Sequence, residues 1–532
     1  MKTYDYIVIG SGFGGSVASM RLAEKGYSVL AIEKGRRFRT EDFPKTNWNL
    51  KKYLWLPQIG FLGFQKLDLY KHAFILSGTG VGGGSLVYAN TLMVPSSEFF
   101  QNNQWKAFNN WEQELKPFYK TAGFMQGRVK FEKFNHEDLV LKEVARDMGM
   151  EASFDNVFVG VYFNEDETPC DPYFNGHGPL RSPCTNCAGC MVGCRENAKN
   201  TLDKNYLWFA EKFGAEIIPE TNVWKIEFQN GEYLIHTKNT KGIFPTGKKV
   251  FRSKGLVVSG GVLGTLKLLL NQKYSYKTLP GLSDTLGHSV RTNSETLNTV
   301  TLSGRKLNNS IAISSIFNPD KDTSIEIVKY PDKSNVMRNL LTMAVDKKGS
   351  GLLRIFHFLV KLITHPVLFF RMAFNRKWAT GTIIFLVMQT LDNKMQMKLK
   401  KWPSRKKLTL KNTGGKKVKA YIPVGQEVMH RYAKKVDAHP QNSTAEILMD
   451  VPSTAHILGG CQMGKDIKTG VIDKNFKVFG YPNMYILDGS VVQGNLGVNP
   501  SLTIAALTEY AMAKIPDKPG NKNKKLEVLL KT

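Results

Sequence analysis

The N-terminal segment constrains the fold of this chain more than any other stretch. Residues 4–9 are apolar and strand-like, residues 16–25 have a helical pattern, and residues 28–32 form a second strand-like run. A glycine turn, GSGFGG at residues 10–15, joins the first strand to the helix. This order predicts a βαβ unit in which the turn and the helix N-terminus face a phosphate group.

Three glycines and one acid make this turn more specific than an ordinary loop. Gly10 permits the tight turn, Gly12 lets backbone amides approach a pyrophosphate, and Gly15 allows the helix to pack closely on the strand. Glu33 ends the second strand, where a carboxylate accepts hydrogen bonds from ribose hydroxyls and disfavours a 2′-phosphate. A purely structural turn is the alternative, but strand, turn, helix and acid together predict a dinucleotide site.

Two later segments favour FAD over NAD as the dinucleotide. Residues 76–85 (LSGTGVGGGS) contain five glycines framed by apolar residues, as expected where backbone approaches a flat or charged group. Residues 485–489 (YILDG) form a strand that ends in an acid and a glycine, which suits a second approach to the cofactor. An NAD site does not need these additional walls, so FAD is the expected cofactor.

The length of 532 residues exceeds what one simple core needs, so two joined domains are expected. Apolar runs at 256–259 and 484–487 each lead into a glycine turn and a helix-like segment, as later strands of a parallel sheet do. The tail at 516–532 is polar and basic and is expected to be mobile. The predicted FAD-binding domain is discontinuous and comprises residues 1–95, 196–300 and 455–532, and the substrate-binding or cap domain comprises residues 96–195 and 301–454.

Five motifs follow one another along nearly the whole chain: GSGFGG at 10–15, GTGVGGGSLVYAN at 78–90, SGGVLGTLKLLL at 259–270, HILGGCQMG at 456–464 and ILDGSVVQGNLGVNPSLTIAAL at 486–507. Together and in this order they resemble the glucose-methanol-choline (GMC) oxidoreductase family, and its cholesterol-oxidase-like branch in particular. With this resemblance the predicted fold class is α/β: a discontinuous Rossmann-like FAD-binding domain with a second α+β substrate domain built on an antiparallel sheet. The implied activity is oxidation of a hydrophobic alcohol, sterol-like or long-chain, by hydride transfer to flavin N5, with oxygen or another acceptor taking the electrons.

The resemblance also assigns cofactor contacts. It implies that the backbone of Val223 meets the adenine, that Gly83 and Asn90 lie along the flavin, and that Asp488 helps to hold it. The full set of predicted cofactor residues is Gly10, Gly12, Phe13, Gly14, Gly15, Glu33, Gly80, Gly83, Gly84, Ser85, Asn90, Val223, Gly260, Asp488 and Gly489.

Three residues are candidates for the chemistry of alcohol oxidation. His456 matches the family's active-site histidine, and imidazole titrates near neutral pH, which suits it to take the hydroxyl proton. Asn499 matches the second active-site position, where an amide donates to the substrate oxygen, although Asn before Pro is also a turn that begins a helix. Glu326 resembles a carboxylate placed over the steroid, with an exposed strand glutamate as the alternative.

Four cysteines lie close together at Cys184, Cys187, Cys190 and Cys194. Their C-x2-C-x2-C-x3-C spacing is that of bacterial ferredoxins, but Arg195 stands where that motif has proline. An iron–sulfur cluster, a zinc ion and unmetallated thiols remain open, and Cys170 or His177 are further candidate ligands. Such tight spacing is unlike a secreted disulfide framework, so a reducing, cytoplasmic location is expected.

A basic, amphipathic segment accounts for most of the net charge of +28. Residues 347–419 contain 18 Lys or Arg and a single acid. Polar residues at a three-to-four spacing predict an otherwise apolar helix over 352–364, a second apolar run follows at 367–374, and Trp378 comes after it. Charges and a proline interrupt the segment, so a membrane-spanning helix is not expected. Two readings stay open for 352–419: peripheral contact with anionic lipid at the inner membrane face, or a lid over an apolar substrate site.

The competing class of function is a basic nucleic-acid-binding protein with a four-cysteine zinc loop and a non-catalytic nucleotide-binding fold. High positive charge and clustered cysteines are typical of such proteins. The glycine-rich framework argues against this class, and no nucleic-acid partner is expected.

Overall fold

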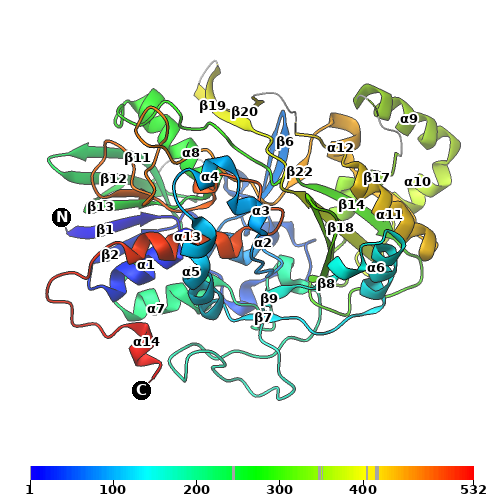
Figure 1. The fold of residues 1–532 in the computed structure, drawn as a ribbon, viewed down its shortest axis with the longest axis horizontal. Helices are drawn as coiled ribbons and strands as arrows, with labels where there is room; N and C mark the ends of the chain where they lie inside the picture. The colour runs from blue at the N-terminus through cyan, green and yellow to red at the C-terminus, as the bar shows by residue number, and fades with distance from the viewer. Residues whose placement is uncertain are drawn as a thin grey trace.

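Two seven-stranded sheets lie side by side in the computed structural model, which describes residues 2–241, 246–345, 349, 351–402, 405–413 and 418–531 (Figure 1). One sheet is largely parallel and the other is antiparallel. This architecture confirms the predicted fold class, whereas the residue boundaries of the two domains stay a prediction.

The N-terminal βαβ unit is confirmed and forms the centre of the first sheet. Strand β1 (Thr3–Ile9) leads into α1 (Phe13–Glu24) and then β2 (Val29–Ile32), which pairs parallel to β1. The two later apolar runs are also confirmed as parallel strands: β13 (Lys249–Val258) pairs with β1, and β23 (Met484–Ile486) pairs with β13. The strand order is β10-β2-β1-β13-β12-β11, with β10 (Glu216–Ile218), β11 (Thr221–Gln229) and β12 (Glu232–Asn239).

Helices cover both faces of this sheet, so its strands are buried, as the continuous apolar runs of β1, β2 and β13 require (Figure 1). One group consists of α1, α5 (Trp111–Met125), α7 (Tyr206–Lys212) and α13 (Ser501–Ala513), and α8 (Gly261–Asn271) lies on the opposite side.

The second sheet carries a candidate catalytic residue near its middle. Its order is β17-β21-β14-β18-β16-β15-β8, and every pairing is antiparallel. Helices α6 (His136–Asp147) and α11 (Pro423–Lys435) pack on one face through an apolar cluster. The strands are β8 (Asp155–Asn156), β14 (Thr296–Thr301), β15 (Ile313–Asp320), β16 (Thr323–Val328), β17 (Leu341–Met343), β18 (Thr382–Gln389) and β21 (His439–Ser443).

The predicted amphipathic helices exist as α9 (Gly351–Thr364) and α10 (Pro366–Ala373), at the end of the molecule farthest from β1 (Figure 1). Within the described residues no single helix is long and apolar enough to cross a membrane, although these two meet that composition together and bend by 99° between them. In α9, Arg354 and Phe358 are buried, and Arg354 forms ion pairs with Glu446 and Asp450, while most of the other apolar residues are exposed.

The remaining elements are short and connect these layers. They are α2 (Leu50–Tyr53), β3 (Trp55–Leu56), β4 (Phe61–Leu62), β5 (Gln65–Tyr70), β6 (Ala73–Gly78), α3 (Ser97–Phe100), α4 (Asn103–Lys106), β7 (Arg128–Lys130), β9 (Phe158–Gly160), β19 (Met395–Trp402), β20 (Arg405–Asn412), α12 (Thr444–Met449), β22 (Ser453–Thr454) and α14 (Leu526–Leu529).

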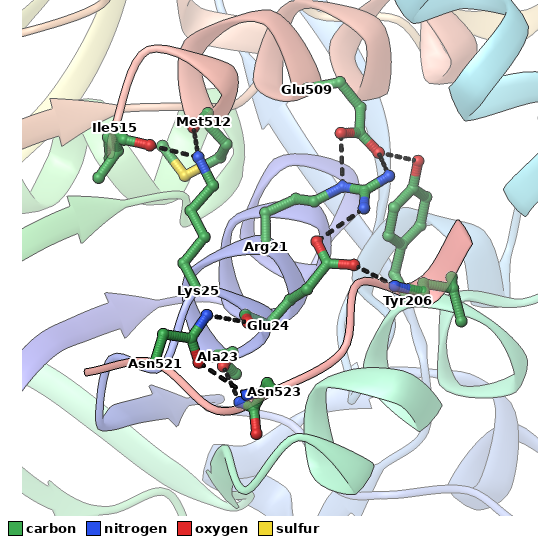
Figure 2. A network of polar contacts seen from close by, with 11 residues as sticks. Arg21, Ala23, Glu24, Lys25, Tyr206, Glu509, Met512, Ile515, Asn521 and Asn523 are labelled. Atoms are coloured by element: carbon green, nitrogen blue, oxygen red, sulfur yellow. Dashed lines mark hydrogen bonds and ion pairs between the residues drawn. The ribbon is translucent and has the colours of Figure 1, made fainter. Parts of the chain in front are cut away.

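The C-terminal tail is packed rather than free, which corrects the expectation of mobility. Figure 2 shows Arg21 of α1 between Glu24 and Glu509, and Glu24 also accepts a hydrogen bond from the backbone N–H of Leu526 at 2.7 Å. Asn523 donates to a backbone carbonyl of α1. Glu24 and Glu509 therefore tie α1 and α13 together through Arg21, and Glu24 also holds the tail. Both acids lie outside the tail, so its own composition does not reveal these contacts.

Candidate functional site

The turn at residues 10–15 forms a cradle with one open side. Gly10 has φ +95°, and a Cβ on Gly14 or Gly15 would overlap a backbone carbonyl oxygen, of Leu487 and Gly10 respectively. At Gly12, in contrast, a Cβ would meet nothing nearer than the Cα of Gly83 at 3.9 Å. Three glycines thus allow close packing of the protein against itself, and Gly12 leaves room for another molecule.

The second glycine loop lies directly on the first. A Cβ on Gly83 would come within 2.6 Å of the Cα of Gly12, and the N–H of Gly82 donates to the Ser11 hydroxyl at 3.2 Å. Gly84 faces the ring of Phe13. The two loops therefore form one continuous backbone surface around the start of α1. Gly80 has φ +141°, and the Ser85 hydroxyl closes the second loop by donating to the carbonyl of Gly82 at 2.7 Å.

Glu33 lies at the end of β2, as the strand pattern predicts, and is buried. Its carboxylate accepts hydrogen bonds from the N–H and hydroxyl of Ser11, at 3.1 and 2.9 Å, and from the N–H of Gly35 at 2.8 Å. Each oxygen retains accepting capacity, so binding a ribose hydroxyl is compatible with this arrangement. Within the protein, Glu33 fixes the conformation of the glycine turn.

The remaining cofactor candidates come from distant parts of the chain. Asp488 accepts hydrogen bonds from the N–H of Ser490 at 2.8 Å and from the hydroxyl of Thr265 at 2.5 Å, and burial raises the pKa of its carboxyl. The Thr265 hydroxyl also accepts from the N–H of Gly260 at 3.0 Å, which joins the start of α8 to the loop of Asp488 and Gly489. Val223 lies on edge strand β11, next to an irregularity in its pairing with β12.

These surroundings fit FAD. The open side of Gly12 faces the second loop, and Asn90 at the end of that loop is fully buried with φ +63°. Both polar atoms of the Asn90 side chain lack a partner, and an unsatisfied buried amide is costly unless a bound molecule pairs with it. A long cofactor that runs from the glycine turn past Asn90 satisfies both observations.

The three predicted catalytic residues come from three separate parts of the chain and meet in space. Glu326 lies in β16, His456 follows β22, and Asn499 precedes the start of α13. The Asn499 amide donates to Glu326 Oε2 at 3.3 Å, and the charges of His456 and Glu326 interact. The loop of His456 also contacts the cofactor candidates, since the N–H of Gly459 donates to the carbonyl of Gly489 at 2.9 Å.

Burial and charge set the protonation of this cluster. Glu326 is fully buried, not an exposed strand residue, and burial raises its pKa to about 7. For His456, burial opposes protonation, but the carboxylates of Glu295 and Glu326 outweigh it and raise the pKa of the imidazole. One oxygen of Glu326 and the amide oxygen of Asn499 have no partner in the protein, so they are available to a substrate.

Glu295 is a further residue of this site that the sequence analysis did not identify. It is buried just before β14, and its Oε2 lies 2.9 Å from Nδ1 of His456. The same carboxylate accepts hydrogen bonds from the Thr454 hydroxyl at 2.9 Å and from the N–H of Ala455. Glu295 therefore holds the loop that carries His456 through hydrogen bonds and contacts the imidazole as an ion pair, although Nδ1 makes no hydrogen bond of good geometry. No local motif around residue 295 signals this role.

The cysteine loop forms a separate place next to the cofactor loops. Cys184, Cys187, Cys190 and Cys194 are free thiols that line one small cavity. The two further candidate ligands are not part of its lining: Cys170 contacts the Tyr162 hydroxyl at 3.1 Å, and His177 lies toward α7, whose Trp208 donates to its carbonyl. Within the described ranges, no three His, Cys, Asp or Glu side chains are arranged to hold a single metal ion.

Comparison with known proteins gives concordant matches along the chain. The family described as GMC oxidoreductase matches residues 394–508, and the one described as NAD(P)-binding Rossmann-like domain matches residues 8–51. A cholesterol oxidase from Acinetobacter baumannii is 42% identical over 97% of this chain and 95% of its own, and one from Mycobacterium tuberculosis is 42% identical over 97% and 91%. A long-chain-alcohol oxidase from Arabidopsis thaliana is 24% identical over 98% of this chain and 68% of its own.

Solved structures agree on the fold. Pyridoxine 4-oxidase from Mesorbium loti is similar with a TM-score of 0.60 at 13% identity, covering 96% of this chain and 98% of its own. An FAD-dependent oxidoreductase from Chaetomium thermophilum gives a TM-score of 0.59 at 14% identity, with the same coverage.

Fold, glycine cradle and relatives together define an FAD-dependent oxidoreductase that acts on CH–OH donors. The chain belongs to the GMC oxidoreductase family, as its five motifs predicted. This class, and not a nucleic-acid-binding protein, is what the comparisons support.

Proposed function

We propose that this enzyme oxidises the CH–OH group of a sterol-like alcohol and that His456 accepts the hydroxyl proton. The observation that carries the proposal is that His456, Glu326 and Asn499 lie together next to the cofactor cradle. Buried polar atoms of Glu326 and Asn499 have no partner there in the protein. The names of relatives at 42% identity, both cholesterol oxidases, support the substrate class.

The surroundings of His456 assign its two ring nitrogens. Nδ1 lies next to the Glu295 carboxylate, which stabilises a proton there and leaves Nε2 of the neutral ring free to accept the substrate's proton. Asn499 positions the substrate oxygen through its amide. The flavin of FAD, when bound, supplies the acceptor for the hydride from the alcohol carbon.

The face of the second sheet that carries Glu326 supports a hydrophobic substrate. Cross-strand partners project from the same face, and Glu326 is paired with Leu386, while the next pair on that face is Val328 with Ile384. These residues belong to a buried apolar cluster on the side opposite α6 and α11. A single carboxylate in such a wall suits a molecule with one hydroxyl on a large apolar body.

A substrate panel with a matched pair of variants tests this function. Anaerobic reduction of the bound flavin, measured by loss of its visible absorbance, should be faster with cholesterol than with long-chain primary alcohols, and absent with choline or glucose. His456→Gln should slow reduction by about 100- to 10,000-fold, the usual contribution of a general base. His236→Gln is the control, because His236 also lies 2.9 Å from a glutamate, Glu227, but in strand β12 of the other sheet. Faster reduction by a polar alcohol, or equal effects of the two variants, would contradict the proposal.

We further propose that α9 and α10 bind the surface of an anionic lipid bilayer, from which such a substrate comes. Leu352, Ile363 and Val367 are 80%, 78% and 79% exposed, an arrangement that is unusual unless another apolar phase covers them. Arg371 and Arg376 are exposed next to this apolar surface, which favours anionic headgroups. Trp378, in contrast, is buried against Tyr330 and is not an interfacial anchor.

The same helices are connected to the catalytic cluster. Arg354 of α9 pairs with the buried Glu446 at 3.7 Å, and Glu446 accepts a hydrogen bond from Thr296, which directly follows Glu295. A lipid-bound α9 is thus connected through Glu446 to the start of β14, directly after Glu295. The basic run at 398–419 also belongs to the predicted contact, although residues 403–404 and 414–417 lie outside the described part of the chain.

Co-sedimentation with vesicles tests the lipid contact. The double variant Ile363→Asp and Val367→Asp should lose binding to phosphatidylcholine–phosphatidylserine vesicles and keep activity on a detergent-solubilised alcohol. Val528→Asp is the control, since Val528 is also half exposed but lies in α14 at the opposite end of the molecule (Figure 1). Unchanged vesicle binding of the double variant, or self-association of the wild type that this variant abolishes, would refute the lipid contact.

A further inference from the structure

The four cysteines of the loop at 184–194 have no part in the proposed alcohol chemistry, yet the structure surrounds them as a site. The cavity that they line is small and partly open to solvent. Its other walls include the apolar side chains of Val161, Ala198 and Ile311, and also Glu196 and Lys199. Four sulfur atoms are therefore the most numerous reactive groups of this cavity.

Two of the four sulfur atoms, those of Cys184 and Cys194, accept a hydrogen bond from a backbone N–H group. Such bonds stabilise negative charge on sulfur and are a general feature of protein iron–sulfur sites, where they tune the cluster. The loop adopts left-handed backbone at Asn186 and Ala188, with φ +54° and +53°, in order to turn around the sulfurs. The N–H of Asn186 donates to Cys184, and the N–H of Lys199 donates to Cys194, both at 3.4 Å.

Two buried cations lie next to the loop, and Asp203 acts on both through its charge without forming an ion pair with either. The ammonium of Lys199 donates to the carbonyl oxygens of Leu86, Tyr88 and Cys190 at 3.0, 3.3 and 2.6 Å. Arg181 donates to the carbonyls of Asn197 and Lys199 and to the Asn200 side chain. In the described part of the chain neither cation forms an ion pair with a carboxylate. Buried cations of this kind are costly unless a negative group lies nearby, and four thiolates around a cluster supply that charge.

The spacing of the cysteines discriminates between metals. A single zinc ion needs each sulfur at about 2.3 Å, so its ligands crowd around one point. In the described residues no three candidate ligands are arranged in that way, although four cysteines line the same cavity. Ligands that surround a space without converging on one point suit a cluster of several iron and sulfide ions.

The loop is also joined to the cofactor cradle. Lys199 binds the carbonyls of Leu86 and Tyr88 with the same ammonium that holds Cys190, and these two residues lie between Ser85 and Asn90. The Ser85 hydroxyl in turn accepts from the N–H of Leu202, just beyond Lys199. One buried lysine therefore spans the cysteine loop and the loop predicted to run along the flavin.

We propose that Cys184, Cys187, Cys190 and Cys194 hold an iron–sulfur cluster beside the flavin loop. Its role rests on the proposed function, because the electrons that it would carry come from alcohol oxidation. Oxidation of one CH–OH group to a carbonyl releases two electrons and two protons; the protons go to solvent, and the cluster passes the electrons singly to a one-electron acceptor such as ferricyanide, of which two are reduced per alcohol.

Metal and sulfide analysis of anaerobically purified protein tests the cluster independently of alcohol oxidation. Iron and acid-labile sulfide should be present in equal amounts, about two to four of each per chain, with an electron paramagnetic resonance signal after dithionite reduction. Protein purified without iron should gain the same content on reconstitution with ferrous iron and sulfide. Cys187→Ser should lose the iron and the signal and keep the FAD, because Cys187 is exposed and its replacement spares the core.

Cys170→Ser is the matched control. Cys170 lies in the same part of the chain but does not line the cavity, so this variant should keep the wild-type iron and sulfide. Zinc at about one per chain without sulfide, failure of reconstitution, or equal iron loss in both variants overturns the proposal. A protein that contains the cluster but does not oxidise alcohols would refute the proposed function alone.

Discussion

Replacing Gly12 with alanine tests the cofactor cradle without disturbing the protein around it. Gly12 has φ −73° and ψ −163°, a conformation that alanine adopts freely. A Cβ there meets the Cα of Gly83 at 3.9 Å, an ordinary van der Waals contact. The added methyl group therefore projects into the space that the two glycine loops leave for the cofactor, and its cost falls on FAD binding alone.

The expected magnitude follows from overpacking. Forcing a methyl group into a filled site costs about 1–3 kcal/mol, which corresponds to a dissociation constant for FAD that is about 5- to 150-fold higher. The free energy of unfolding of the FAD-free protein should change by less than about 0.5 kcal/mol. Gly14→Ala is the matched variant: its Cβ overlaps the carbonyl oxygen of Leu487, so it should destabilise even the FAD-free protein, by about 3 kcal/mol.

Two measurements on each variant separate these effects. FAD is titrated into cofactor-free protein and followed by quenching of flavin fluorescence, and unfolding of the cofactor-free protein is followed in urea. Wild-type FAD affinity in Gly12→Ala would refute the assignment of the open side of the cradle to the cofactor. Equal unfolding of Gly12→Ala and Gly14→Ala would refute the packing argument.

Three further substitutions test the charges of the molecule. Glu295→Gln removes the carboxylate that raises the pKa of His456, so the acid limb of the pH profile of kcat/KM, where the neutral base is lost, should move to lower pH. The value of kcat should be about 10- to 100-fold lower. An acid limb that does not move contradicts the role of Glu295. Glu326→Gln should remove an ionisation near pH 7 from the same profile, since burial raises the pKa of this carboxyl to about 7; a profile that keeps it shows that another group titrates there. Arg21→Met leaves two buried glutamates unpaired (Figure 2) and should lower the free energy of unfolding by about 3–5 kcal/mol; a loss below about 1 kcal/mol in urea unfolding would show that the network is dispensable.

Sequence reasoning succeeded where the determinants are local. The βαβ unit depends on a strand, a turn and a helix that are adjacent in the chain, and Gly15 is required by a contact with Gly10 inside the same motif. The strands at β13 and β23 were recognisable because buried parallel strands are continuous apolar runs. The helix α9 was likewise predictable from the spacing of its polar residues.

Features that depend on distant partners were not predictable. Glu295 contacts His456 only because β14 and the loop after β22 meet in space. The burial of Arg354 in α9 was not predicted, because its partners come from α12 and the residue after it. The tail was predicted to be mobile because its composition is polar, whereas its backbone binds the buried Glu24 of α1. Helical periodicity identifies a face but not what covers it.

A kinetic isotope effect on flavin reduction tests whether this enzyme transfers a hydride from a sterol alcohol to its flavin. Purified protein is mixed anaerobically with cholesterol that carries deuterium on the carbinol carbon, and the loss of flavin absorbance is followed in a single turnover. We expect the flavin to be fully reduced and the ketone to form. The rate should be several-fold slower than with unlabelled cholesterol, because the bond to that hydrogen breaks as the flavin is reduced. A flavin that stays oxidised with hydrophobic alcohols would contradict the proposed alcohol oxidation.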